Sequence, residues 1–247
     1  MLETLLKLLL TKGVPTLWQN RKTLKLYFQT RFGKYRKEKI RFSISYLFRI
    51  RIPNSNKYLL VFNRRIDNQL QPVGGVYKRY GADHLFESWG YEPDCSKKGV
   101  GVDELSDGDL RFRVYGKYVI NVIKWFEEGM ERETSANREF TEELLDENIL
   151  DADLFRKIRY KLVGRHSKQL QWSAHHSCHE VLIYDIVELL PTSEQSAYLV
   201  ELTKKATFVA GRYAIVEGSE IEQLRLTADG QQIARIGEHT KYTINQK

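Results

Sequence analysis

From residue 42 onward, apolar and polar side chains follow a strand-like pattern. Apolar residues at 48, 50 and 52 alternate with Arg49 and Arg51, which predicts a strand with one apolar and one cationic face. Residues 53–56 have the composition of a turn, and residues 57–62 predict the returning strand of a hairpin.

Two helices are predicted from apolar residues spaced three and four positions apart. The first stripe runs from Val119 to Phe126, and Gly129 is the residue expected to end that helix. The second helix covers residues 134–147. Its apolar stripe repeats every four residues, at Ala136, Phe140 and Leu144.

The remaining segments have weaker patterns. Residues 79–117 are rich in Gly, Asp and Lys with few periodic apolar positions, so they are predicted to form a long loop or insertion. Residues 157–190 alternate and predict two or three antiparallel strands. Ser219 and Glu222 have the spacing of a capping box and predict a short helix through Leu226.

These patterns predict one main α/β domain, residues 42–247, after a basic N-terminal extension, residues 1–41. Within the extension, residues 2–10 predict a short amphipathic helix that packs on the protein body or contacts a partner protein or membrane surface. No apolar run approaches the roughly 20 residues that a transmembrane helix needs.

The positive charge is concentrated near the N-terminus. The chain has a formal net charge of +7, and 16 of its 39 Lys and Arg residues lie in residues 1–65, which hold only two acidic residues. Aromatic residues are interleaved with the cations of residues 21–41, namely Tyr27, Phe28, Phe32 and Tyr35. The sequence leaves four interpretations open: nucleic acid, an anionic membrane surface, a phosphorylated small molecule, or a solvated surface without a partner.

Only two cysteines occur, Cys95 and Cys178, and they are far apart in the sequence. This does not suggest a disulfide framework, so a reducing cytoplasm is the expected location. The first residues also lack the basic region and small-residue cleavage site of a secretory signal.

An acidic cluster is the strongest chemical signal in the chain. Glu139, Glu142 and Glu143 are spaced i, i+3 and i+4, which places them on one side of a helix turn, where their like charges repel. Arg138 can neutralise Glu142, and a divalent cation such as Mg²⁺ can neutralise the others. The alternative is a solvent-exposed charged helix face.

Two further motifs carry weaker signals. Adjacent glycines at Gly74 and Gly75 permit a tight bend and a close approach of the backbone to a ligand, although a plain turn explains them equally. On a strand, His175 and His179 would share one face, and only a bulge or turn would gather residues 175–179 into a zinc site. A single histidine that contacts a phosphate, assigned to His176, is the favoured interpretation.

The segment Arg138-Glu139-Phe140-Thr141-Glu142-Glu143 resembles the core of the Nudix box, Arg-Glu-apolar-X-Glu-Glu. Residues 70–78 around the Gly pair, together with residues 110–114, 132–135 and 237–242, resemble more narrowly the SMODS-associated NUDIX domain. The resemblance covers roughly residues 45–245. It implies a Nudix-type α/β/α sandwich with a mixed sheet, preceded by the N-terminal extension and interrupted by the insertion at about 79–117.

The resemblance also implies a site. The matching glutamates of Nudix enzymes coordinate Mg²⁺ or Mn²⁺, and the matching arginine orients one of them, so the predicted catalytic residues are Arg138, Glu139, Glu142 and Glu143. A backbone carbonyl of the Gly pair, assigned to Gly75, completes the metal shell. The residues predicted to contact the substrate are Arg49, Arg51, Arg64, Arg65, Gly74, Tyr77 and His176.

The chain departs from the ordinary Nudix box in three ways. An insertion separates the Gly pair from the acidic helix. The acidic residue expected eight positions before the arginine falls at Met130; Glu131 and Glu133 are nearby substitutes, and Glu133 is preferred as the metal ligand. The glycine expected after the paired glutamates is Leu145. The metal-binding core is therefore intact, whereas the loops that set substrate and activity are altered.

The leading hypothesis is a Mg²⁺- or Mn²⁺-dependent Nudix hydrolase that cleaves a pyrophosphate bond in a nucleotide. The resemblance associates it with bacterial anti-phage (CBASS) systems that make nucleotide signals. The alternative is a non-catalytic sensor that binds a cyclic or linear oligonucleotide and changes its assembly state, for example as a homo-oligomer. A third interpretation is nucleic-acid binding through residues 20–41, with salt-dependent affinity.

Overall fold

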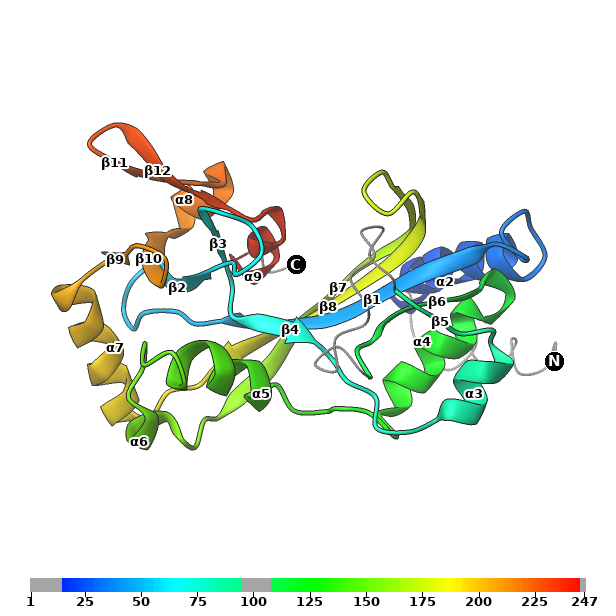
Figure 1. Ribbon diagram of the computed structural model, residues 1–247, viewed down its shortest axis with the longest axis horizontal. Helices are drawn as coiled ribbons and strands as arrows, with labels where there is room; N and C mark the ends of the chain where they lie inside the picture. Colours follow the sequence, from blue (N-terminus) through cyan, green and yellow to red (C-terminus); the bar gives the residue numbers. More distant parts are fainter. Residues whose placement is uncertain (1–14, 95–107, 245–247) are drawn as a thin grey trace. The chain divides into compact units, whose positions relative to one another are not determined.

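The computed structural model describes residues 15–94 and 108–244 (Figure 1). Its helices are α2 (Pro15–Arg31), α3 (Asp83–Ser88), α4 (Val119–Glu128), α5 (Asn137–Phe140), α6 (Ala152–Phe155), α7 (Ser193–Lys205), α8 (Gly218–Gln223) and α9 (Lys241–Ile244), with shorter helical turns η2 (Gly116–Tyr118), η3 (Thr141–Leu145) and η4 (Glu238–Thr240). Its strands are β1 (Lys39–Arg49), β2 (Lys57–Phe62), β3 (Gln69–Gln71), β4 (Gly74–Val76), β5 (Glu92–Pro93), β6 (Arg111–Tyr115), β7 (Tyr160–Ser173), β8 (Cys178–Leu189), β9 (Phe208–Val209), β10 (Tyr213–Glu217), β11 (Arg225–Ala228) and β12 (Gln231–Ile236).

The strands of the described residues form two sheets. In the first, hydrogen-bonded neighbours follow the order β5-β6-β1-β8-β7, and β4 also pairs with β1. In the second the order is β11-β12-β3-β2-β10-β9. Strands β12 and β3 run parallel whereas β2 and β3 run antiparallel, so this sheet is mixed. Helices together with a mixed sheet make an α+β fold, which confirms the predicted class and is compatible with the expected sandwich.

The chain divides into two compact units, each assembled from three separate stretches. The first unit consists of residues 1–44, 78–133 and 167–182. The second unit consists of residues 45–77, 134–166 and 183–247. Strands β1, β7 and β8 are long enough to contribute residues to both units.

The core of the first unit is rich in aromatic residues. The rings of Phe42 on β1 and Phe112 on β6 are stacked, with centroids 5.5 Å apart. Phe86 of α3 packs edge-on against Trp125 of α4, with centroids 4.9 Å apart. Because all four side chains are almost completely buried, they bring α3 and α4 against this part of the sheet.

The interpretation of residues 79–117 as a loop was wrong for much of that segment. Helix α3 and strands β5 and β6 lie within it, and Phe86 and Phe112 belong to the core. These elements span at most six residues each, which is too short for a helix or strand periodicity to stand out among the Gly, Asp and Lys residues.

The core of the second unit is aliphatic. Leu60 on β2, Leu70 on β3 and Ala214 on β10 are 1% exposed or less, and they pack in one cluster with Ile236 of β12. Strand β2 pairs with β10 over five residues, from Lys57 opposite Glu217 to Val61 opposite Tyr213. The loop after β2 extends from this sheet.

The predicted hairpin of residues 42–62 is only partly present. The turn forms as predicted, because the amide of Ile52 donates to the carbonyl of Lys57 and Arg51 is bridged to Tyr58. Beyond the turn, however, β1 and β2 belong to different sheets. Strand β1 is buried on both faces rather than one. The face that carries Arg49 is also covered, because Arg49 contacts Thr243 and Glu188.

The two predicted helices were confirmed in position. Helix α4 starts at Val119, and Gly129 ends it in the left-handed conformation with φ of 73°. In the second helical segment the predicted stripe of Ala136, Phe140 and Leu144 is buried. Regular helix begins only at Asn137, three residues later than predicted, because Ala136 is still outside the helical region of backbone angles.

The predicted capping box at Ser219 and Glu222 was wrong. The box that opens α8 is made by Glu217 and Glu220, and the helix ends before Leu224. Leu224 adopts a left-handed conformation and Leu226 belongs to β11. Glutamate is an unusual first residue for a capping box, so the Ser-x-x-Glu spacing two residues later misled the prediction.

The predicted amphipathic helix of residues 2–10 lies outside the described residues, as does Cys95. Strands β7 and β8 account for the predicted strands of residues 157–190. Within the residues that the structure describes, no helix is both long and apolar enough to cross a bilayer.

Candidate functional site

The acidic residues lie on a helix that changes its winding. Helix α5 is followed at once by η3, a π-helical turn, in which the amide of Asp146 donates to the carbonyl of Thr141, five residues earlier, at 2.9 Å. Phe140 and Leu144 are buried and fix this segment to the second unit. A π turn accommodates an extra residue in the helix and is often found at functional sites.

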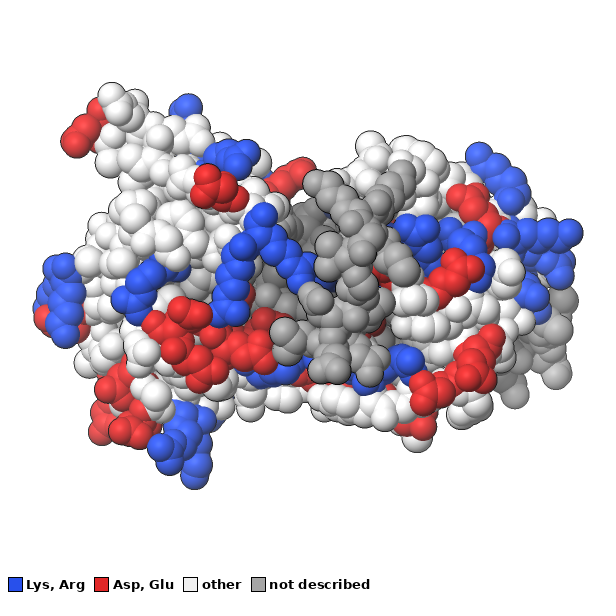
Figure 2. All heavy atoms as spheres, in the orientation of Figure 1, with Lys and Arg blue, Asp and Glu red and all other residues white. Residues whose placement is uncertain are grey.

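The three glutamates of this segment differ in exposure. The side chain of Glu139 is 16% exposed and that of Glu142 is 46% exposed. Glu143 is partly buried. Figure 2 shows that acidic side chains gather on the surface over α5 and the turn that follows it. Glu139 and Glu143 therefore face the protein, whereas Glu142 lies at its surface.

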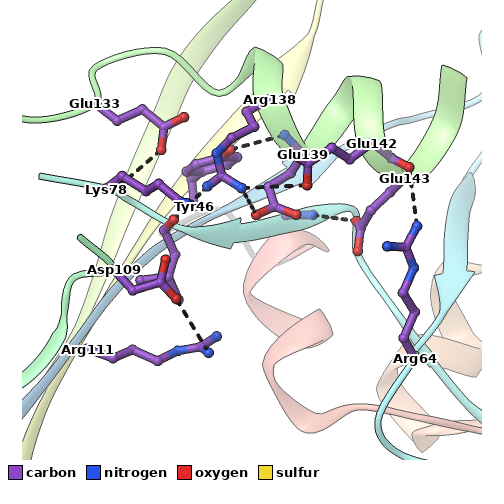
Figure 3. Close-up of polar contacts among 12 residues, drawn as sticks. Tyr46, Arg64, Lys78, Asp109, Arg111, Glu133, Arg138, Glu139, Glu142 and Glu143 are labelled. Carbon is purple, nitrogen blue, oxygen red and sulfur yellow. Dashed lines mark hydrogen bonds and ion pairs between the residues drawn. The ribbon is translucent and has the colours of Figure 1, made fainter. Parts of the chain in front are cut away.

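The Gly pair lies directly against Glu139 and Glu143. The amide of Gly74 donates to Oε2 of Glu143 at 3.0 Å (Figure 3). A Cβ atom on Gly75 would overlap the carboxylate of Glu139, so only glycine leaves room for that side chain. Strand β4, which carries the pair, is itself held by antiparallel pairing with β1, with Gly75 opposite Tyr46.

Arg138 connects the acidic helix to strand β4. Its Nη1 lies 2.5 Å from Oε1 of Glu139 and 3.7 Å from Oε2 of Glu142. Its Nη2 donates to the carbonyl of Val76 at 2.9 Å (Figure 3). One guanidinium thus offsets the repulsion between two carboxylates and fixes the orientation of Glu139.

The carboxyl group of Glu143 binds a proton more tightly than an ordinary glutamate does. Burial raises the pKa of Glu143 from 4.5 to about 7. The hydrogen bond from the Gly74 amide and the charge of Arg64 act in the opposite direction, while the charges of Glu139 and Glu142 add to the rise. A carboxyl group with a pKa near neutrality is suited to proton transfer, and a cation beside it would favour its ionised form.

The donors fit a small hard cation. Carboxylate oxygens are preferred ligands of Mg²⁺, which is often bound by one or two protein carboxylates with water and substrate phosphates completing its shell. Glu139 lies against Gly75 and Glu143 accepts a hydrogen bond from the Gly74 amide, and together they supply such carboxylate oxygens. Across residues 15–94 and 108–244, no three His, Cys, Asp or Glu side chains form a ready-made metal-binding group.

A cavity of about 190 Å³ opens beside Glu143. Arg64, from the loop after β2, lines it and donates from Nη2 to Oε1 of Glu147 at 2.7 Å and to the carbonyl of Glu142 at 3.3 Å. Arg212, from the turn before β10, lines it as well and donates from Nη2 to the carbonyls of Glu147 and Asn148. The cavity therefore combines two carboxylates, Glu143 and the Arg64-paired Glu147, with two guanidinium groups.

Arg212 and Glu147 were not singled out in the sequence. Arg212 follows Gly211, a turn residue with φ of 73°, and it lies 69 positions after Glu143. A Gly-Arg pair in a turn is a common surface pattern, so nothing local distinguishes this arginine. Only the pairing of β10 with β2 brings it to the cavity.

The other predicted phosphate-binding arginines lie elsewhere in the second unit. Arg49 is 5% exposed, donates to the carbonyl of Thr243 and lies 3.8 Å from Glu188. Arg51 is exposed and donates to the carbonyl of Ser55 at 2.7 Å. Arg65 is exposed next to Arg64 but does not line the cavity. Of these arginines, the cavity includes only Arg64.

Tyr77, Glu133 and His176 have other surroundings. The hydroxyl of Tyr77 donates to Asp185 at 3.0 Å within the second unit, and the ring is buried. Glu133 is buried in the first unit, where it accepts a hydrogen bond from the amide of Lys78 at 3.2 Å. His176 also belongs to the first unit, in the turn between β7 and β8, and burial, followed by the charge of Arg41, lowers its pKa.

The comparisons with known proteins identify one relationship. A family model described as the SMODS-associated NUDIX domain matches residues 39–244. No curated protein and no solved structure matches the chain. The matched range contains the Gly pair, the acidic helix, Arg64 and Arg212.

Proposed function

Since the chain belongs to the SMODS-associated NUDIX domain family, we propose that it binds Mg²⁺ or Mn²⁺ at Glu139 and Glu143 and hydrolyses a diphosphate-linked nucleotide. Nudix proteins generally use divalent cations. The observation that carries the proposal is the contact of both carboxylates with the Gly pair, beside a cavity lined by Arg64 and Arg212. In this proposal the ligand is a nucleotide signal of the kind associated with anti-phage defence.

Each group has a distinct part in the proposed reaction. When bound, the cation supplies Lewis-acid stabilisation of the diphosphate charge. Arg138 keeps Glu139 oriented, and the Gly74 amide orients Glu143. Glu143 accepts a proton from a water molecule, whose oxygen bonds to one phosphorus atom. The bridging P–O bond then breaks, and a nucleoside monophosphate leaves with the other phosphorylated product.

The test is turnover by the purified full-length chain with Mn²⁺ or Mg²⁺ over a panel of diphosphate-linked nucleotides. Release of a nucleoside monophosphate is expected. Glu143→Gln should lower kcat about 100-fold or more, because the amide cannot accept the proton. Glu201→Gln, on the exposed surface of α7, is the matched control and should leave kcat unchanged. Absence of turnover over the whole panel would contradict the proposed hydrolysis.

The two cavity arginines are expected to hold substrate phosphates. Within the described residues each guanidinium makes its hydrogen bonds from Nη2 alone, so Nε and Nη1 are available to a ligand. Hydrogen bonds to charged groups contribute about 1.5–3 kcal/mol. Arg64→Ala and Arg212→Ala should therefore each lower kcat/KM about 10-fold or more.

Arg65→Ala is the control for this pair, since Arg65 adjoins Arg64 in sequence and does not line the cavity. Its kcat/KM should stay within about twofold of the unmodified protein. If Arg65→Ala and Arg64→Ala had equal effects, general surface charge rather than the cavity would explain substrate binding.

A binding function without turnover is the second candidate. It is favoured by the exposed position of Glu142. Among the described residues, the three glutamates do not form a ready-made metal-binding group. Calorimetry with cyclic and linear oligonucleotides would distinguish the two functions. A sensor would bind one of them and return it chemically unchanged, whereas a hydrolase would return cleaved products.

A further inference from the structure

A second cavity, of about 280 Å³, lies in the first unit. It is formed where α2 meets η2 and the start of α4. Tyr27 and Arg31 of α2 line one side, and Lys117, Tyr118, Asn121 and Lys124 line the other. These residues belong to the same unit, so the cavity is complete without the acidic helix.

The cavity holds three positive charges. No acidic residue is among its lining residues, and within the described residues Arg31, Lys117 and Lys124 make no ion pair with a carboxylate. Nη1 of Arg31 donates a hydrogen bond to the carbonyl of Lys117 at 3.3 Å, which does not neutralise the charge of the guanidinium. Three cations in one concave site produce a focused positive potential that attracts anions.

Arg41, another arginine of the first unit, has its charge neutralised by carboxylates. Arg41 lies 2.8 Å from both Asp94 and Glu180, and all three side chains are about 10% exposed or less. The chain therefore supplies carboxylates where a buried arginine serves the fold. The cavity cations are less buried than Arg41, with Lys124 exposed, so their charges are accessible to an external anion.

Two tyrosine rings border these cations. Nζ of Lys117 lies 4.8 Å from the ring centroid of Tyr118. Tyr27 packs edge-on against Phe28 and Phe32, with centroids 5.7 Å and 5.8 Å away, and both phenylalanines are more than half exposed. Aromatic faces next to cations are the combination that binds a nucleobase together with its phosphate.

We infer that this cavity binds a mononucleotide, with its phosphate on Arg31, Lys117 and Lys124 and its base on the tyrosine rings. The volume of about 280 Å³ is close to the lower end of the range of about 300–1,000 Å³ that holds one drug-sized ligand, which suits a mononucleotide rather than a longer oligomer. The inference does not depend on the proposed hydrolysis, since none of these residues belongs to the second unit.

The test is calorimetry on the full-length chain with AMP and, separately, inorganic phosphate. EDTA and the Glu143→Gln substitution together remove metal-dependent binding at the acidic helix. AMP should bind with a Kd below about 1 mM and at least about 10-fold more tightly than phosphate. Equal affinities would overturn the assignment of a nucleotide, and no saturable binding of AMP would overturn the site itself.

Substitutions then locate the binding. Lys117→Glu and Lys124→Glu should each weaken AMP binding about 10-fold or more. The matched control is Lys34→Glu, a charge reversal at an exposed lysine of the same unit that does not line the cavity. Asn121→Trp, at an exposed helix position, should block the cavity, with an unchanged circular dichroism spectrum verifying the fold.

Two outcomes would contradict this location. If Lys34→Glu weakened AMP binding as much as Lys124→Glu, the attraction would come from a diffuse basic surface. If a single-stranded 20-mer bound while AMP did not, the surface would be a nucleic-acid-binding face rather than a mononucleotide site.

Discussion

Replacing Gly75 with alanine is expected to lower Mn²⁺ affinity and nucleotide turnover 100-fold or more in a protein that still folds. The added Cβ would overlap the carboxylate of Glu139, which must then leave its position and its contact with Arg138. A misplaced catalytic group can cost about 100-fold in rate. Gly75 does not have a positive φ, so its backbone conformation accommodates alanine without strain.

Gly164→Ala is the matched control for this substitution. Gly164 lies on β7, does not have a positive φ, and a Cβ there would meet no atom within 4 Å. Both variants should melt close to the temperature of the unmodified protein, and only Gly75→Ala should lose cation binding in a titration followed by calorimetry. Full Mn²⁺ affinity in Gly75→Ala would show that Glu139 is not part of the metal site.

In the absence of divalent cations, the titration of Glu143 is expected to lower the free energy of unfolding by about 3 kcal/mol as the pH rises from 4.5 to 8. The pKa of this group is about 7 in the folded protein and 4.5 as its ordinary value, so the folded state binds the proton more tightly. The resulting stability is fully present below pH 4.5 and is lost as the pH rises through 7, at up to about 1.4 kcal/mol per pH unit.

Urea denaturation at several pH values in EDTA would measure this loss. Glu143→Gln should remove the Glu143 contribution to the pH dependence, because an amide does not titrate, and Glu201→Gln should leave it in place. Mn²⁺ should also reduce the loss, since a bound cation compensates the buried negative charge. If the unfolding free energy of Glu143→Gln depended on pH as it does in the unmodified protein, the pKa of the Glu143 carboxyl group would not be raised by folding.

The local part of the candidate site could be predicted from the sequence. The four-residue stripe of Ala136, Phe140 and Leu144 predicted which side of the acidic helix is buried, and these residues are buried. The resemblance to the Nudix box linked this helix with Gly74 and Gly75, more than 60 residues away. Spacing alone could not do so, because periodicity describes neighbours along one element and not contacts between distant elements.

Two features of the site depend on tertiary structure. The π turn at residues 141–145 is maintained by a hydrogen bond between Thr141 and Asp146, and its sequence resembles that of any glutamate-rich helix. Arg212 reaches the cavity through the pairing of β10 with β2. Neither feature leaves a periodic signal in the sequence.

The orientation of the cationic strand face also depends on tertiary structure. Alternation predicted that Arg49 and Arg51 share a face, and it could not predict what covers that face. The carbonyl of Thr243, nearly 200 residues later, accepts a hydrogen bond from Arg49, whereas Arg51 is exposed. Two arginines with the same local pattern therefore have different surroundings.

The composition of each unit from three separated stretches determines how the chain can be shortened. A truncation that removes residues 1–41 would delete α2 and the start of β1, including the fully buried Ile40. It would also remove Arg41 and leave the carboxylates of Asp94 and Glu180 without their shared cation. Asp94 would keep the charge of Arg113 at 3.8 Å, but the buried carboxylate of Glu180 would lose its cation at a cost of several kcal/mol. Deletion of the N-terminal segment should therefore yield an unstable fragment rather than an independently folded domain.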